Sequence, residues 1–204
     1  MKKKRIKRME KMMEKIDKEK IKRGMEMILE GLDIDLDSPN FRDTPKRVAD
    51  MYSEIFSGLT RDVKKDIKLY ETKNQDEMII LRDIPFYSMC EHHLLPFYGV
   101  VHIAYIPKNN KITGFSNLIE VVDTMSKRPQ IQERLTTDIA DTLVKLLNPR
   151  GIFVIVEAEQ LCLYMRGIKK PGTYTITSAI RGIMKNDITR QEALNLIGAG
   201  RKNI

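Results

Sequence analysis

The sequence lacks the features that would place the protein in a membrane or outside the cell. Its 204 residues include no tryptophan and only two cysteines. No apolar run approaches the roughly 18 residues that a membrane-spanning helix needs. The first residues are charged from Lys2 onward, without the apolar core of a secretory signal. We therefore expect a cytoplasmic protein with reduced thiols and no membrane partner.

The body of the chain lacks an excess of either charge. Residues 1–23 hold 12 of the 36 basic and 4 of the 28 acidic residues, which accounts for the whole net charge of +8. A basic extension of this kind is usually a solvated helix. We predict a basic helical extension over residues 1–23 and a single domain over 24–200. No aromatic residue interrupts the basic segment, so we do not expect nucleic-acid binding. A basic nucleic-acid module would instead bind in a strongly salt-dependent way and need residues 1–23.

The apolar pattern changes period along the chain. Helical spacing occurs in five segments, namely 1–31, 44–58, 117–126, 129–147 and 189–197. Short runs rich in β-branched residues predict five strands, namely 77–84, 98–106, 152–158, 161–166 and 173–179. Strands that flank a long helical pair indicate an α+β fold with an antiparallel sheet.

Reactive side chains are concentrated in the segment from Ser88 to Pro96, which we predict to be a loop between strands. Cys90 and His93 are three residues apart, so both can reach one metal ion. A thiolate with an imidazole suits zinc. The other cysteine, Cys162, is predicted to start a strand beside this loop. Three protein ligands would leave a fourth position for water, as in a catalytic rather than a structural zinc site.

Spacing alone leaves a second interpretation open. Cys90 and Cys162 could be small buried residues, and His93 a hydrogen-bonded loop histidine. A single Cys-x-x-His motif is weak, so the choice depends on the residues around it.

Those surrounding residues resemble the GTP cyclohydrolase I family. The resemblance runs in register from about residue 20 to about residue 197. Its motifs include CEHH at 90–93, AYIP at 104–107, GFS at 114–116, RPQIQERLT at 128–136 and MRG at 165–167. Long motifs in a fixed order are far more specific than the metal spacing.

The resemblance implies both a fold and a reaction. The fold is the tunnelling fold, an antiparallel sheet with two long helices on one face, assembled into a homo-oligomer. In this family the oligomer is a decamer with sites between subunits. The reaction is zinc-dependent hydrolysis of GTP: the imidazole ring opens at C8, formate leaves, and the ribose rearranges to give 7,8-dihydroneopterin triphosphate.

The resemblance also implies roles for individual residues. The implied Zn²⁺ ligands are Cys90, His93 and Cys162. The implied catalytic residues are His92, for proton transfer at the imidazole, and Ser116, at the ribose.

The implied substrate-binding residues lie on other parts of the chain. Gln132 and Glu133 would recognise guanine, because a carboxylate suits two neighbouring N–H donors. Arg166, and Arg47 from a neighbouring subunit, would hold phosphates, which a guanidinium binds well.

Three positions depart from the family pattern. Gln160 replaces a histidine, Asn117 a lysine and Glu120 an arginine. Gln160 does not titrate near neutral pH, and the other two exchanges change the local charge by about −3. Two alternatives follow. The enzyme could stop at a formamidopyrimidine or use a less phosphorylated guanine nucleotide, or the chain could be a non-catalytic zinc-containing nucleotide binder.

Overall fold

The computed structural model describes residues 16–63, 67–73 and 75–199. The chain divides into two compact units, residues 1–61 and 62–204. Within the described ranges, no helix has both the length and the apolar character needed to cross a membrane. Residues 1–15 of the predicted helix over 1–31 lie outside the described residues, and the predicted division of the chain after residue 23 stays a prediction.

The first unit is a helix pair. Helix α2 (Lys18–Gly31) begins after Asp17, whose side chain accepts a hydrogen bond from the Lys20 backbone at 3.0 Å. Helix α3 (Thr44–Ile55) has Pro45 in its first turn, where a missing N–H costs nothing. The two helices pack together, and the short 3-10 helix η1 (Ser57–Leu59) follows. Helix α3 begins at the predicted Thr44, and α2 ends at the predicted Gly31, but residues 16 and 17 are not helical, so the predicted continuous helix over 1–31 is interrupted there.

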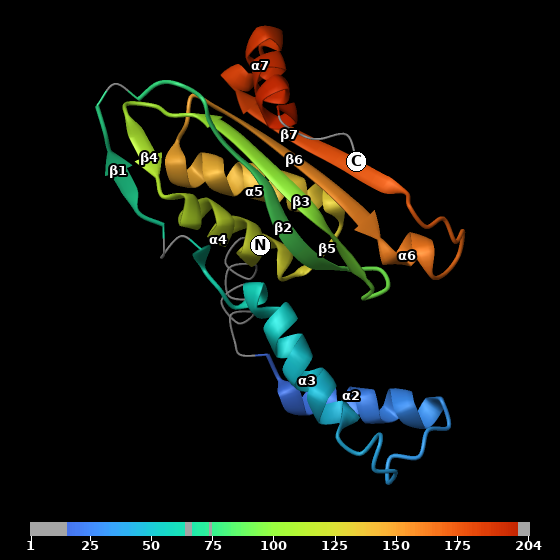
Figure 1. Cartoon of the computed structure of the whole chain (residues 1–204). Helices are drawn as coiled ribbons and strands as arrows, with labels where there is room; N and C mark the ends of the chain where they lie inside the picture. Colours follow the sequence, from blue (N-terminus) through green and yellow to red (C-terminus); the bar gives the residue numbers. More distant parts are fainter. Residues whose placement is uncertain (1–15, 64–66, 74, 200–204) are drawn as a thin grey trace, which may run out of the picture. The chain divides into compact units, whose positions relative to one another are not determined.

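The second unit is built on a five-stranded sheet with the order β5-β2-β3-β6-β7 (Figure 1). Its neighbouring strands are antiparallel except for β5, which pairs with β2 in parallel. The strands are β2 (Ile79–Cys90), β3 (Pro96–Ile106), β5 (Pro129–Gln130), β6 (Gly151–Gln160) and β7 (Tyr174–Gly182). A separate pair joins β1 (Leu69–Glu71) to β4 (Lys111–Thr113).

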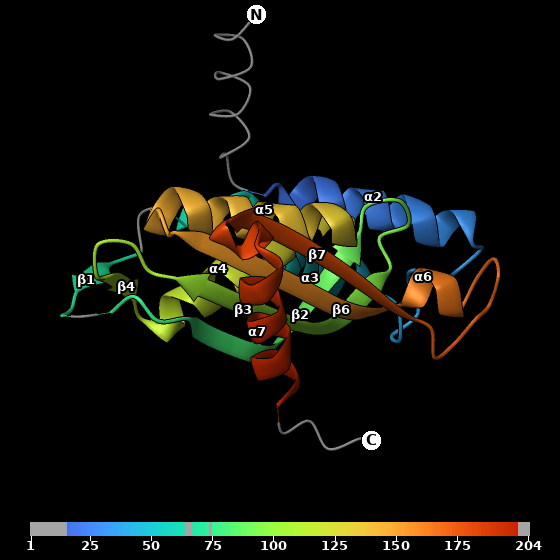
Figure 2. The same cartoon turned by 90° about the horizontal axis from the view of Figure 1, so that it is seen from above.

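Helices cover the two faces of this sheet unequally. The pair α4 (Phe115–Ser126) and α5 (Gln132–Leu147) lies on one face, and α7 (Asp187–Gly198) lies on the other (Figure 2). The 3-10 helix η3 (Ile183–Lys185) leads into α7. Alternate residues of β6 enter two different cores, Val154 under α4 and α5 and Phe153 under α7. The fold is therefore α+β, with paired helices on one face of an antiparallel sheet, as predicted.

Three local predictions were wrong. Residues 161–166 do not form a strand, because α6 (Leu161–Tyr164) is a single helical turn. Four consecutive apolar residues carry no periodicity that would distinguish the two states. Pro129 does not open a helix but lies in β5, at an edge position that tolerates a missing N–H. The predicted loop from 88 to 96 is also shorter, since β2 continues to Cys90 and β3 begins at Pro96.

Candidate metal centre

The turn between β2 and β3 is folded tightly back on the end of β2. The backbone N–H of Cys90 donates to Leu95 at 2.8 Å, and the N–H of Leu94 donates to the Cys90 carbonyl at 2.8 Å. Leu94 adopts a positive φ of 51°, which lets the chain reverse within a few residues. This turn places His93 beside Cys90.

The three predicted ligands converge. The side-chain ligand atoms of Cys90, His93 and Cys162 all lie within 4.8 Å of one another. Cys162 reaches the site because β6 pairs with β3, with Gln160 opposite Phe97, so that α6 begins next to the turn. Cys162 thus comes from a helical turn rather than from the predicted strand.

The chemistry of this donor set fits a metal ion. Cys90 is buried, Cys162 is half-buried and His93 is exposed. Burial and the neighbouring Cys90 thiol both raise the pKa of Cys162. A bound cation would offset the cost of bringing two thiolates together. Two sulfur donors and one imidazole are the ligand types that zinc prefers, and three of them leave a coordination position open.

Arg166 contacts this cluster directly. Its Nη1 donates to Nε2 of His93 at 2.6 Å. A neutral imidazole has one N–H and one lone pair, so an accepting Nε2 leaves the proton on Nδ1. The hydrogen bond to Arg166 and a metal bond from His93 therefore exclude each other, and metal loading would free the guanidinium of Arg166.

His92 lies at the edge of the cluster and is exposed. Its Nδ1 is 3.9 Å from Sγ of Cys90, and its Nε2 is 3.9 Å from Oε1 of Glu91. The exposed ring is therefore next to the candidate metal ligands, and its proton-transfer role stays a prediction.

The two predicted guanine-binding residues have different surroundings. Glu133 is exposed in the first turn of α5, and no hydrogen bond or ion pair is found for it within the described residues. Gln132 is buried, and its Nε2 donates to the carbonyls of Val156 at 3.0 Å and Thr175 at 2.8 Å. Its Oε1 accepts from Nε2 of Gln160 at 2.8 Å. Both polar atoms of Gln132 are thus occupied within this chain.

Ser116 is not brought to the metal ligands. It is exposed in the first turn of α4, whereas Ser126 at the other end of α4 accepts a hydrogen bond from Ser88, two residues before Cys90. Ten residues of helix separate the two serines by about 15 Å. Arg47 lies in the first unit, where it pairs with Asp43 at 3.7 Å.

Two of the three positions that depart from the family pattern, Asn117 and Glu120, lie in the amino-terminal part of α4, whereas Gln160 is the last residue of β6. Asn117 donates through Nδ2 to the Lys68 carbonyl at 3.2 Å and to Oγ1 of Thr113 at 2.8 Å. It therefore ties the start of α4 to β4. Glu120 is half-buried one turn further along.

Sequence reasoning missed two polar clusters near the metal ligands. The carboxylate of Glu159 accepts hydrogen bonds from the hydroxyls of Tyr164 at 2.5 Å and Tyr174 at 2.7 Å. Glu91 and Arg134 form an ion pair. The only sequence signal for the second pair is that each residue directly follows a predicted site residue.

An antiparallel sheet backed by paired helices, with two thiols and an imidazole gathered where β2 and β6 end, is the architecture of the tunnelling-fold class with a candidate metal site. The family model of GTP cyclohydrolase I matches residues 21–198. The chain therefore belongs to the GTP cyclohydrolase I family.

Relatives of known name agree with this assignment. The chain is 55% identical over 184 residues to GTP cyclohydrolase 1 of Carboxydothermus hydrogenoformans, covering 90% of this chain and 96% of the relative. It is 54% identical over 187 residues to GTP cyclohydrolase 1 of Caldanaerobacter subterraneus, covering 91% of this chain and 100% of the relative. Both relatives are matched over nearly their whole length.

Proposed function

We propose that this chain catalyses the hydrolytic opening of the imidazole ring of GTP at C8. Formate is released, and the product is 7,8-dihydroneopterin triphosphate. The observation that carries the proposal is the convergence of Cys90, His93 and Cys162 within 4.8 Å, beside an exposed His92. The name of the relatives, GTP cyclohydrolase 1, supplies the substrate.

The metal that we propose is zinc, held by the two thiolates and His93. When bound, it supplies Lewis-acid chemistry and makes water a better nucleophile near neutral pH. His92 transfers a proton to a ring nitrogen of the purine as the bond to C8 breaks. Glu133 has a carboxylate that is available to two neighbouring guanine N–H groups. The buried Gln132 holds the first turn of α5, which carries Glu133, against β6 and β7.

We propose that the complete site is shared between copies of the chain. Ser116 lies about 15 Å from the metal end of α4, so it meets the ribose only if a second copy presents it. Arg166, once freed from His93, and Arg47 of a neighbouring copy would bind the phosphates. This arrangement favours a homo-oligomer with sites at its interfaces, and the family resemblance suggests a decamer.

A second candidate function is a truncated reaction, and Gln160 favours it. An amide cannot exchange protons near neutral pH, and its Nε2 is already committed to Gln132. The ring would then open, but the later rearrangement would stop at a formamidopyrimidine or its deformylated product. Asn117 and Glu120 would be consistent with a substrate that carries fewer phosphates.

Product analysis separates these functions. The zinc-loaded protein is incubated with GTP, GDP, GMP and guanosine, while pterin fluorescence, formate and purine absorbance are followed. Pterin fluorescence from GTP supports the complete reaction, and loss of purine absorbance without a pterin supports the truncated one. In the truncated case Gln160→His should add pterin formation. No consumption of any substrate at full zinc occupancy would leave a non-catalytic nucleotide binder.

A further inference from the structure

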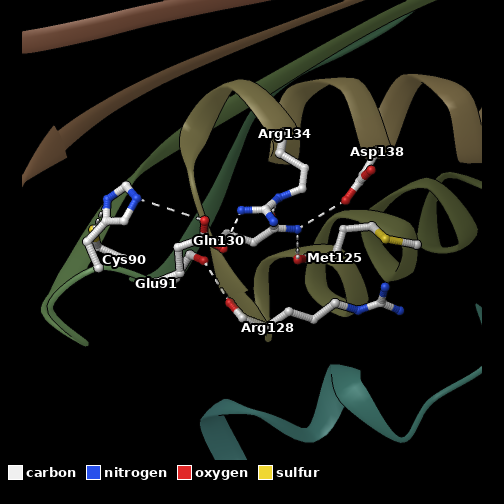
Figure 3. A network of polar contacts seen from close by, with 9 residues as sticks. Cys90, Glu91, Met125, Arg128, Gln130, Arg134 and Asp138 are labelled. Carbon is white, nitrogen blue, oxygen red and sulfur yellow. Dashed lines mark hydrogen bonds and ion pairs between the residues drawn. The ribbon is translucent and has the colours of Figure 1, made fainter. Parts of the chain in front are cut away.

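The metal-binding turn and the proposed guanine-binding helix are joined by a pair of charged residues. Glu91 directly follows the ligand Cys90, and Arg134 directly follows Glu133 in the first turn of α5. Nη2 of Arg134 donates to Oε2 of Glu91 (Figure 3). Each partner is thus the immediate neighbour of a residue that the proposed function uses.

Gln130 orients both members of this pair. Its side chain is 2% exposed, and its Oε1 accepts from Nε of Arg134 at 3.1 Å. Its Nε2 donates to the Met125 carbonyl at 3.2 Å and to Asp138 at 3.3 Å, which fixes the amide orientation. Its backbone carbonyl accepts from the N–H of Glu91 at 3.0 Å. One buried residue therefore holds the guanidinium by its side chain and the turn by its backbone.

This ion pair is poorly placed to stabilise the fold. The side chains of Arg134 and Glu91 are 43% and 32% exposed, and ion pairs at such positions contribute little to unfolding free energy. Its geometric effect is larger, because the guanidinium makes two directed contacts. The other carboxylate oxygen of Glu91 lies 3.9 Å from Nε2 of His92. The pair therefore restrains the turn that carries His92 and His93.

We propose that Arg134 is a positioning residue that sets the metal-binding turn against the first turn of α5. By holding Glu91, it fixes the distance between the metal ligands and the carboxylate of Glu133. The inference rests on the proposed function, since it needs a metal and a guanine ring to be positioned. Arg134 itself touches neither.

The chain offers a matched control on the same helix. Asp141, two turns further along α5, accepts from Nε of Arg181 at 2.8 Å, with side chains 44% and 36% exposed. This second pair has the same chemistry and a similar exposure, but Arg181 lies in β7, away from the turn. Asp141→Asn therefore measures how much zinc affinity and KM change when a similar ion pair is lost away from the proposed metal ligands.

The test uses Arg134→Gln, Arg134→Lys, Glu91→Gln, the double variant of Arg134→Gln with Glu91→Gln, and Asp141→Asn. Zinc affinity is measured by competition with a chromophoric chelator, and thiolate ligation by the absorption of the cobalt-substituted protein. We expect Arg134→Gln to bind zinc about tenfold more weakly, because the turn that carries two of the proposed ligands would lose its restraint, and contacts outside the coordination shell have effects of about this size. Its KM for GTP should rise about tenfold, and the double variant should match the worse single variant. In Arg134→Lys the ammonium group can reach Glu91 but not Gln130 at the same time. Its zinc affinity and KM should therefore lie between those of the wild type and those of Arg134→Gln.

The proposal fails if Arg134→Gln keeps the zinc affinity and the KM of the wild type. It also fails if the effects of the two single variants add in the double variant, or if Asp141→Asn loses as much zinc affinity as Arg134→Gln. Zinc affinity does not depend on turnover, so it tests the positioning role even if GTP proves not to be the substrate. A wild-type protein that binds zinc but makes no product would instead refute the proposed function. Should Arg134→Gln fail to fold, Arg134→Lys and Glu91→Gln carry the same comparison.

Discussion

The two ends of helix α4 differ in how much of the proposed site one chain completes. At the carboxyl-terminal end, the carbonyl of Ser126 accepts from Ser88, and the ligands Cys90, His93 and Cys162 converge nearby. At the amino-terminal end, Ser116 is exposed and far from those ligands. One end brings the three candidate metal ligands together within this chain, whereas the other presents the predicted site residue Ser116 away from them.

This difference suggests that metal binding and nucleotide binding depend on different contacts. Metal binding needs only contacts that the fold of residues 62–204 makes by itself, so it should survive when copies are kept apart. Binding and conversion of a nucleotide should need the amino-terminal end of α4 from another copy.

The largest effect is expected at the metal end. Cys162→Ser removes one of three ligands, so the purified protein should lose most of its zinc as measured by elemental analysis. We expect kcat to fall at least ~1000-fold, because a metal ion supplies several kcal/mol of transition-state stabilisation. Met165→Leu, three residues further along on an exposed position, is the control and should keep its metal. Full zinc occupancy in Cys162→Ser would remove this cysteine from the centre.

Mixing two inactive variants tests whether the ends of α4 meet across copies. Cys162→Ser destroys the metal end, and Ser116→Trp places a bulky ring at the exposed start of α4. If both are co-expressed in equal amounts, random assembly should restore about a quarter of wild-type activity, because a quarter of shared sites combine two intact halves. Size-exclusion chromatography checks that both variants still assemble. Activity that stays at the level of the separate variants would place the whole site within one chain.

An intermediate effect is expected at Gln132, which joins α5 to β6 and β7. Gln132→Ala leaves the carbonyls of Val156 and Thr175 without their donor, and unsatisfied buried groups of this kind cost about 1–3 kcal/mol of unfolding free energy. Urea denaturation measures the loss. Glu133→Ala is the control, since that exposed side chain should affect KM but hardly change stability. Equal stability of both variants would show that Gln132 is not a structural residue.

The metal ligands and Gln132 also differ in how far the sequence could predict their surroundings. The clustering of the three candidate metal ligands was predictable because Cys90 and His93 belong to one local motif and Cys162 is the only other cysteine. The burial of Gln132 was not, because its partners Val156 and Thr175 are distant in sequence and meet it only through sheet pairing.

The helices and strands show the same limit. Leu135, Ile139 and Leu143 are fully buried, as their fourfold spacing in α5 predicts. The pair β1 and β4 was missed, because strands of three residues give too short a pattern. Local signals thus give the types of the longer elements, whereas contacts across the sheet decide which polar side chains are available to a ligand.

A smaller effect is expected at the amino-terminal end of α4. If this end meets a triphosphate, the carboxylate of Glu120 repels it. Glu120→Gln should therefore lower KM for GTP about threefold to tenfold, a range typical of removing one charge near a solvated phosphate. KM for guanosine should not change. Asp123→Asn, one turn further along the helix, is the control, and equal effects on GTP and guanosine would argue against phosphate at this end.

The smallest effect is expected beside the metal end, at Glu159. Hydrogen bonds from Tyr164 and then Tyr174 hold the pKa of Glu159 below its ordinary value of 4.5. A carboxyl whose pKa is lower in the folded state stabilises the fold above its unfolded pKa, and this contribution is lost as the pH falls through the folded pKa. Tyr174→Phe should therefore raise the pKa of Glu159 and slightly reduce stability above the unfolded pKa, with little change at lower pH. Carbon-detected NMR titration measures this pKa, and Tyr87→Phe, which changes an exposed tyrosine of β2 on the far side of β3 from Glu159, should leave it unchanged. Because this contact lies just before Cys162, an accompanying loss of zinc would show that the tyrosines also hold α6 in place.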